Sequence, residues 1–210
     1  MENPGVKEFV RNAQRQLDVL GYTEHSVRHI SLVAERAANV LEELGYDEHR
    51  IELARIAGYI HDIGNAVNRV DHAHTGAILA YNILKDMNMD ASDRTEIMMA
   101  IGNHDEKTGT AIDVVSAALI LADKTDVRRN RVRNTIPSTF DKHDQVNYAV
   151  LSSKLEIDLE KKIIHLKTEL DEEMCSVLDY FEIFLERMLM CRRAAEKLGL
   201  KFKMTANGSK

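Results

Sequence analysis

The sequence predicts a mainly α-helical bundle with a small antiparallel β-hairpin or sheet and a long C-terminal helix. Only two prolines and ten glycines occur in 210 residues, too few for a sandwich or barrel of many short strands and tight turns. Apolar residues recur at helical spacing through most of the chain, whereas strict alternation is confined to residues 154–169. The length is sufficient for one sizeable core.

Capping signals mark the first three predicted helices, because polar side chains stand where each apolar periodicity begins. Within the third, the segment IELARIAGYI is apolar on most faces, which predicts a central, buried helix. The three are expected to run from Asn3-Pro4 to Leu20-Gly21, from Thr23 to Leu44-Gly45, and from Asp47 to Gly64.

The rest of the chain contains further helices, followed by a change of pattern. Residues 71–87, 91–104 and 111–129 have helical periodicity, and the polar, basic stretch 130–145 is expected to be a loop. Alternation over 154–158 and 163–169, with a turn at 160–162, predicts a hairpin. A long amphipathic helix is expected from Glu172 to Leu198, ended by Gly199, and LKFKM is a candidate third strand.

Composition and charge exclude several classes of protein. The formal net charge of −6 does not favour binding to bulk nucleic acid. No window approaches 18 uncharged apolar residues, so no membrane association is expected, and the first residues lack the apolar region of a secretory signal. Cys175 and Cys191 would lie about 24 Å apart along one straight helix, too far for a disulfide. A reduced, cytoplasmic protein is expected.

Ionisable residues follow two of the most apolar segments. His61 and Asp62 come directly after IELARIAGYI, and Asp123 comes directly after VVSAALILA. A buried carboxylate without a partner costs several kcal/mol, so it must change its pKa, meet a cation or bind a metal. Two such carboxylates and an adjacent histidine suggest one shared cation. In the alternative interpretation, Asp62 caps a local turn and Asp123 pairs with an arginine such as Arg28.

Five segments together make a more specific pattern: HSVRH, AGYIHDIG, HAHTGA, IGNHDE and LILADKTD. Their order and spacing over residues 23–127 resemble the HD superfamily of metal-dependent phosphohydrolases. The resemblance implies an HD-type metal-binding helical domain over residues 1–130, with the loop, hairpin and C-terminal helix of residues 131–210 packed on the same domain. It also implies hydrolysis of a phosphate ester or anhydride through a metal-activated water, and a nucleotide is a plausible substrate by resemblance only.

The same resemblance implies the site residues. Asp62 is the expected bridge if two ions bind, because a carboxylate has two oxygens to share. Mixed imidazole and carboxylate ligands suit Mn, Fe, Co, Ni or Zn better than Mg, and a bound metal lowers the pKa of its water. The first metal would have His25, His61, Asp62 and Asp123, and a second metal or the substrate phosphate would have His72, His104 and Asp105.

Several positions depart from the pattern or leave alternatives. His25 lies about 120° from the centre of its helix's apolar stripe, so its assignment rests on the resemblance. His72 and His74 compete for one role, and the distance to Gly76 favours His72. Asn65 stands where many relatives carry lysine, and Arg69 is a possible substitute. Asp105 replaces the histidine of the cyclic-dinucleotide-cleaving branch, which is therefore not expected. His29 shares a helix face with His25 but has no role in the pattern.

Basic residues cluster after Asp123 in an otherwise acidic chain. They are Lys124, Arg128, Arg129, Arg131 and Arg133. A phosphate clamp is one interpretation, and a solvated helix end is the other. We expect Asp62 and Lys124 to be catalytic, and the substrate-binding residues to be Arg28, Lys124, Arg128 and Arg129.

The C-terminal helix carries spare aromatic and aliphatic area, which predicts a homodimer through this helix and the hairpin; in the alternative, this face closes the helical core. Its apolar residues are Val177, Tyr180, Phe181, Phe184, Leu185, Met188 and Leu189. The second functional hypothesis is a non-catalytic metal- or nucleotide-binding module that acts as a regulatory dimer. Hydrolysis of guanosine polyphosphates is less favoured, because residues 65–70 lack the expected Glu-Asp pair.

Overall fold

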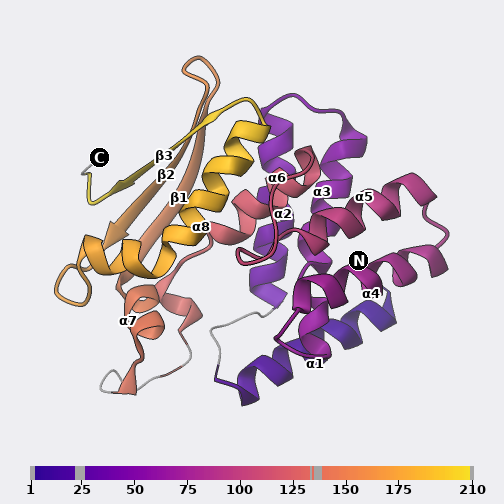
Figure 1. The fold of residues 1–210 in the computed structure, drawn as a ribbon, viewed down its shortest axis with the longest axis horizontal. Coiled ribbons are helices and arrows are strands. Elements are labelled where there is room, and N and C mark those ends of the chain that lie inside the picture. Colours follow the sequence, from indigo (N-terminus) through magenta and orange to yellow (C-terminus); the bar gives the residue numbers. More distant parts are fainter. Residues whose placement is uncertain (1–2, 22–26, 133, 135–138, 209–210) are drawn as a thin grey trace.

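The computed structural model describes residues 3–21, 27–132, 134 and 139–208, and it confirms a mainly α fold with a small sheet (Figure 1). The N-terminal elements are α1 (Pro4–Val19), α2 (Val27–Glu43), α3 (Glu48–Ile60), the 3-10 helix η1 (Ile63–Ala66), α4 (His72–Asp86), α5 (Ala91–Gly102) and α6 (Val114–Lys124). The C-terminal elements are η2 (Arg129–Arg131), α7 (Lys142–Ala149), β1 (Val150–Asp158), β2 (Ile163–Leu170), α8 (Val177–Lys197) and β3 (Lys201–Ala206).

The predicted caps explain where two early helices begin. The Asn3 side chain accepts hydrogen bonds from the backbone of Gly5 and Val6, and Asp47 accepts one from the backbone of Arg50. Thr23, the third predicted cap, lies outside the described residues. The third helix ends at Ile60 rather than at Gly64, and the chain continues into the short η1 helix.

Three helices begin at residues other than those predicted, because each start is set by a capping side chain that was not predicted. The predicted helix over 111–129 begins only at Val114, where Asp113 and Ser116 form a capping box. The predicted loop over 130–145 was wrong at its end, because Asp141 caps α7 from Lys142 onward. Similarly, α8 begins at Val177 behind a Ser176–Asp179 capping box rather than at residue 172.

The sheet has the order β1-β2-β3 and combines two directions. The predicted hairpin is antiparallel, and Leu155 pairs with Leu166 on the core side. The predicted third strand is also present, but it runs parallel to β2 because α8 carries the chain back along the sheet (Figure 1). Gly199, with φ +76°, makes the turn from α8 into β3.

The core is centred on α6, whose residues from Val115 to Ala122 are fully buried. Helices α2 and α3 approach closely, since a Cβ on Gly58 would lie only 2.7 Å from the Ala34 Cα. Met190 and Cys191 of α8 and Leu166 of β2 belong to the same apolar cluster as α6. The C-terminal elements therefore pack directly on the helical core.

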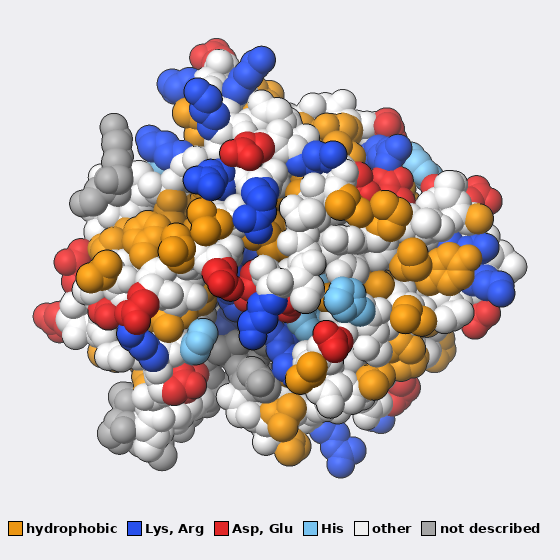
Figure 2. Space-filling view, in the orientation of Figure 1, with side chains coloured by type: hydrophobic (Ala, Val, Ile, Leu, Met, Phe, Trp, Pro, Cys, Tyr) orange, Lys and Arg blue, Asp and Glu red, His pale blue; other side chains and the backbone are white. Residues whose placement is uncertain are grey.

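None of the helices in the described part of the chain has both the length and the apolar character needed to span a bilayer. In the space-filling view, acidic, basic and histidine side chains gather near the middle of the visible face, between apolar patches on either side (Figure 2).

Candidate metal centre

Several helix ends bring buried imidazoles and carboxylates to one place. His61 and Asp62 follow α3, Asp123 lies in the last turn of α6, and His72 opens α4. These side chains are buried, although they come from separate helices that are far apart in the sequence. The cluster is completed by His104, which follows α5, and by His29 in the first turns of α2.

The Asp62 carboxylate lies at the centre of this cluster. Its Oδ2 is 3.3 Å from Nε2 of His61 and 3.9 Å from Nε2 of His29. Its Oδ1 is 3.6 Å from Nε2 of His72 and 3.9 Å from Nε2 of His104. The two oxygens of one side chain therefore face two different pairs of imidazoles, an arrangement compatible with a bridging ligand.

Asp123 approaches the cluster beside the first pair. Its Oδ1 lies 3.4 Å from Nε2 of His29 and 3.8 Å from Nε2 of His61. Among the described residues, two sets of three side chains have potential ligand atoms that lie within 4.8 Å of one another inside each set. One set is His29, His61 and Asp123, and the other is His61, Asp62 and His104.

The second ring nitrogen of each imidazole is held by an acceptor, so Nδ1 carries the proton and Nε2 faces the cluster with its lone pair. This orientation is the one in which imidazoles bind metals. Nδ1 of His61 donates to the Gly58 carbonyl oxygen at 2.7 Å, and Nδ1 of His104 donates to that of Ile101 at 2.6 Å. Nδ1 of His72 donates to the Arg69 carbonyl oxygen at 3.2 Å. Nδ1 of His29 donates to the Asp126 carboxylate at 2.8 Å.

This donor set fits a divalent transition metal. Imidazole nitrogens and carboxylate oxygens are the ligands that such ions accept together. Among the described residues, Nε2 of the buried His61 has no hydrogen-bond partner. A buried polar atom without a partner is costly, and a cation bound to it would remove that cost.

The pKa values of the histidines reflect their surroundings. Burial, followed by the charge of Lys124, holds the pKa of His104 well below its usual value, and burial also lowers the pKa of His72. These rings are neutral, as metal ligands must be. Burial also acts to lower the pKa of His61, but Asp62 and Asp123 together outweigh it and raise that pKa.

Lys124 is bound to the cluster by two ion pairs. Its Nζ lies 2.8 Å from Oδ2 of Asp123 and 2.9 Å from Glu106, and the side chain is buried. Glu106 is also 3.4 Å from Nε of Arg187 on α8. Although burial acts to raise the pKa of Asp123, Lys124 and His29 hold it well below its usual range. Lys124 thus keeps Asp123 ionised, which a metal ligand requires.

The structure distinguishes His72 from His74. His72 is buried in the cluster, whereas the His74 side chain is 53% exposed and lies 3.8 Å from Asp71. Asp105 lies at the edge of the cluster, with Oδ2 3.9 Å from Nδ1 of His72. His25, the first ligand implied by the resemblance, lies outside the described residues.

The arginines predicted to bind substrate contact residues other than Asp62, which lies at the centre of the cluster. Arg128 donates two hydrogen bonds to Asp126. The Arg129 guanidinium donates to the Tyr148 carbonyl oxygen and to Asp171, and it stacks on the Tyr148 ring. It therefore faces α7 and the end of β2. Arg28 lies beside the Asn130 amide, whose oxygen accepts from the guanidinium at 2.9 Å when suitably oriented.

Sequence reasoning assigned no role to His29, which the structure places against Asp123. A signal was available: His29 directly precedes Ile30 and lies four residues before Val33, so it continues the apolar stripe of α2. A histidine on the buried side of a helix must be paired or bound. Asp126 and Glu106, which contact His29 and Lys124, were also not identified from the sequence.

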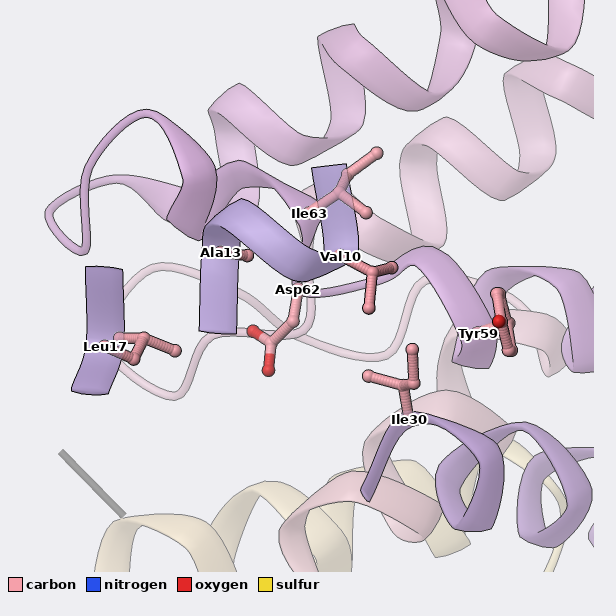
Figure 3. Close-up of a pocket in the computed structure, with 7 residues that line it drawn as sticks. All are labelled: Val10, Ala13, Leu17, Ile30, Tyr59, Asp62 and Ile63. Atoms are coloured by element: carbon pink, nitrogen blue, oxygen red, sulfur yellow. The ribbon is translucent and has the colours of Figure 1, made fainter. Parts of the chain in front are cut away.

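A small cavity lies behind Asp62. In Figure 3 the carboxylate projects among apolar side chains of α1 and α2. The cavity measures about 10 Å³, room for about one water molecule. It is lined by Val10, Ala13, Leu17, Ile30, Tyr59, Asp62 and Ile63. Helix α1 thus provides an apolar wall on this side of the cluster.

Comparison with known proteins identifies the class. The sequence model of the family described as HD domain matches residues 24–166. Proteins of this class bind divalent metals, and the family is one of metal-dependent phosphohydrolases, in agreement with the histidine and aspartate cluster. The chain belongs to the HD domain family.

Two similar proteins come from Methanocaldococcus jannaschii and from an uncultured Thermotogales bacterium. An uncharacterized protein of Methanocaldococcus jannaschii is 28% identical over 135 residues, which cover 54% of this chain and 52% of the relative. The chain thus spans about half the length of that curated relative. A solved structure of a predicted HD superfamily hydrolase from an uncultured Thermotogales bacterium is 29% identical. It aligns with 59% of this chain and 67% of its own, with a TM-score of 0.47.

Proposed function

We propose that this protein is a metal-dependent phosphohydrolase that cleaves a phosphate ester or anhydride. The observation that carries the proposal is the position of Asp62, whose two oxygens face two separate pairs of imidazoles. Two ions bridged by one carboxylate are suited to hydrolysis at phosphorus, because they stabilise the attacking and leaving oxygens together.

Each imidazole pair would hold one ion. In this assignment His29 takes the position that the resemblance gave to His25. When bound, the ions would act as Lewis acids that lower the pKa of water and neutralise phosphoryl charge. The first site comprises His29, His61, Asp62 and Asp123, and the second comprises Asp62, His72 and His104, with Asp105 at its edge.

The surrounding residues hold these ligands in place. Nδ2 of Asn65 donates to Oδ1 of Asp62 at 2.8 Å, which fixes the orientation of the central carboxylate. Lys124 is committed to Asp123 and Glu106. We therefore assign Lys124 to keeping Asp123 ionised rather than to holding the phosphate.

Arg69 is the cation that we assign to the phosphoryl group. Its guanidinium lies 3.3 Å from the side-chain oxygen of Asn65. Asn65 is the residue that orients Asp62. The neighbouring Val67 and Val70 are 57% and 72% exposed. A cation beside apolar side chains suits a phosphate attached to a less polar group, and a nucleotide has this character. The resemblance supports the same substrate class.

The proposal is tested by reconstitution followed by assay. The protein is stripped of metal, loaded separately with Mn, Fe, Co, Ni, Zn or Mg, and the bound metal is quantified. Turnover is then measured on a generic phosphomonoester, on nucleoside mono- and triphosphates, and on sugar phosphates. Asp62→Asn should lose metal and turnover, whereas Asp171→Asn, which changes a carboxylate paired with Arg129, should retain both. Stoichiometric metal without turnover on any substrate would favour the non-catalytic binding module.

A further inference from the structure

Asp126 is a fully buried carboxylate to which the reaction proposed above gives no role. It lies three residues after Asp123, just beyond the end of α6. Its Oδ2 is 2.8 Å from Nδ1 of His29, a residue 97 positions earlier in the chain. The contact joins the end of α6 to the first turns of α2, directly behind the imidazole that faces Asp123.

Three arginines surround this carboxylate. Arg128 donates to both of its oxygens, at 2.5 and 2.9 Å. Arg131 donates to the Asp126 main-chain oxygen at 2.6 Å, and its Nη1 lies 3.8 Å from Oδ2. Arg36 of α2 approaches Oδ1 to 3.8 Å. With so many cationic neighbours, Asp126 is held as a carboxylate despite its complete burial.

An ionised carboxylate determines which tautomer His29 adopts. Because the carboxylate can only accept hydrogen bonds, the proton must lie on Nδ1 of His29. Nε2 then keeps its lone pair, and it points to Asp123 at 3.4 Å and to Asp62 at 3.9 Å. The other three imidazoles of the cluster use main-chain carbonyl oxygens for this purpose. His29 has the charged partner, which makes its Nε2 a stronger donor to a cation.

We propose that Asp126 is a positioning residue that fixes the tautomer and orientation of His29 and thereby strengthens divalent-metal binding at the cluster. This inference rests on the metal centre of the proposed function. It adds that Arg128 belongs to this support of His29, and that its role is not contact with the substrate phosphate. Replacing a carboxylate behind a metal-binding histidine commonly weakens metal affinity 10–100-fold.

The first test uses the wild-type protein and needs no substitution. In the zinc-loaded protein with ¹⁵N-labelled histidine, the His29 ring should show a protonated Nδ1 and a metal-bound Nε2. The resonance is assigned by its absence in His29→Gln. A His29 ring bound through Nδ1, or with its proton on Nε2, would overturn the inference whether or not any Asp126 variant folds.

The second test is a double-mutant cycle on zinc affinity, measured by competition with a chromophoric chelator. Asp126→Asn should weaken binding 10–100-fold, and His29→Gln should weaken it at least as much. In the His29→Gln background, Asp126→Asn should have little further effect, because its influence passes through His29. Asp171→Asn is the matched control, since it also removes a carboxylate charge from an arginine partner.

The outcomes separate the two proposals. If His29→Gln binds zinc as tightly as wild type, His29 is no ligand, and both the first metal site and this inference fail. If His29→Gln weakens binding while folded Asp126→Asn binds as wild type, only the inference fails. If Asp126→Asn weakens binding equally in both backgrounds, Asp126 acts through general stability and the positioning role is rejected.

Discussion

Replacing Lys124 with methionine should destabilise the protein strongly while leaving its shape nearly unchanged. The side chain is buried, and its Nζ forms ion pairs with Asp123 and Glu106. Methionine fills much of the same volume but carries no charge. The substitution therefore leaves two carboxylates without the cation that lies between them.

The magnitude follows from the remaining contacts. Removing one partner of a buried ion pair costs about 3–5 kcal/mol. Glu106 keeps the Arg187 guanidinium at 3.4 Å as a cationic partner, so we expect the lower end, about 3 kcal/mol. For a chain of this size, each kcal/mol moves the melting temperature by about 2–4 °C. The metal-free variant should thus melt about 6–12 °C below wild type.

The pH dependence of this loss has a definite sign. Despite burial, which raises them, Lys124 holds the pKa values of Asp123 and Glu106 below their ordinary values of 3.8 and 4.5. Carboxyls with depressed pKa values stabilise the fold above their ordinary pKa, and this contribution is lost as the pH falls. The variant has less of this contribution to lose. The difference between wild type and variant should therefore narrow below about pH 4.5.

The assay is thermal and urea unfolding of metal-free protein, followed by circular dichroism from pH 7 down to pH 3.5. Lys107→Met is the matched control, because Lys107 is an exposed lysine close in sequence, and it should change stability by less than about 0.5 kcal/mol. Adding metal should recover part of the loss in Lys124→Met, since a cation again neutralises Asp123. If Lys124→Met is as stable as wild type at pH 7, the assigned charge-balancing role is refuted.

Three other predictions follow from the site and the C-terminal helix. Complete chelation should lower the melting temperature, since an ion at a hundred times its dissociation constant stabilises the fold by about 2.7 kcal/mol. An unchanged melting temperature after confirmed metal loss would contradict a ligand set that joins several helices. Arg69→Ala should reduce kcat/KM about tenfold or more with metal retained, because a charge-assisted hydrogen bond contributes about 1.5–3 kcal/mol. Arg129→Ala is the control and should behave as wild type, because the Arg129 guanidinium binds Asp171. The protein should sediment as a dimer at micromolar concentration, and Leu185→Glu should make it monomeric, since Leu178 and Leu185 of α8 are 78% and 50% exposed. If the wild type sediments only as a 23.8 kDa species, the dimer is rejected.

The sequence by itself determined most of the secondary structure and the identity of the family. Local chemistry specifies helix starts such as Asn3-Pro4 and Asp47, because a capping side chain satisfies backbone groups within its own turn. Alternation around Leu155 and Leu166 was sufficient to place the hairpin. The apolar run before Asp123 also predicted that α6 would be buried. These signals involve residues within a few positions of one another, so they can be read without the fold.

The tertiary structure decided which histidines and arginines lie at the site. His29 faces Asp123 because α2 packs beside α6, and its partner Asp126 is 97 residues away. The motif spacing favoured His72, but only packing shows that His74 remains exposed. Arg129 turns toward Asp171, 42 residues later, because the start of β1 and the end of β2 lie beside it. Burial and ion pairing are properties of the neighbours that long-range packing brings together, and local sequence does not encode them.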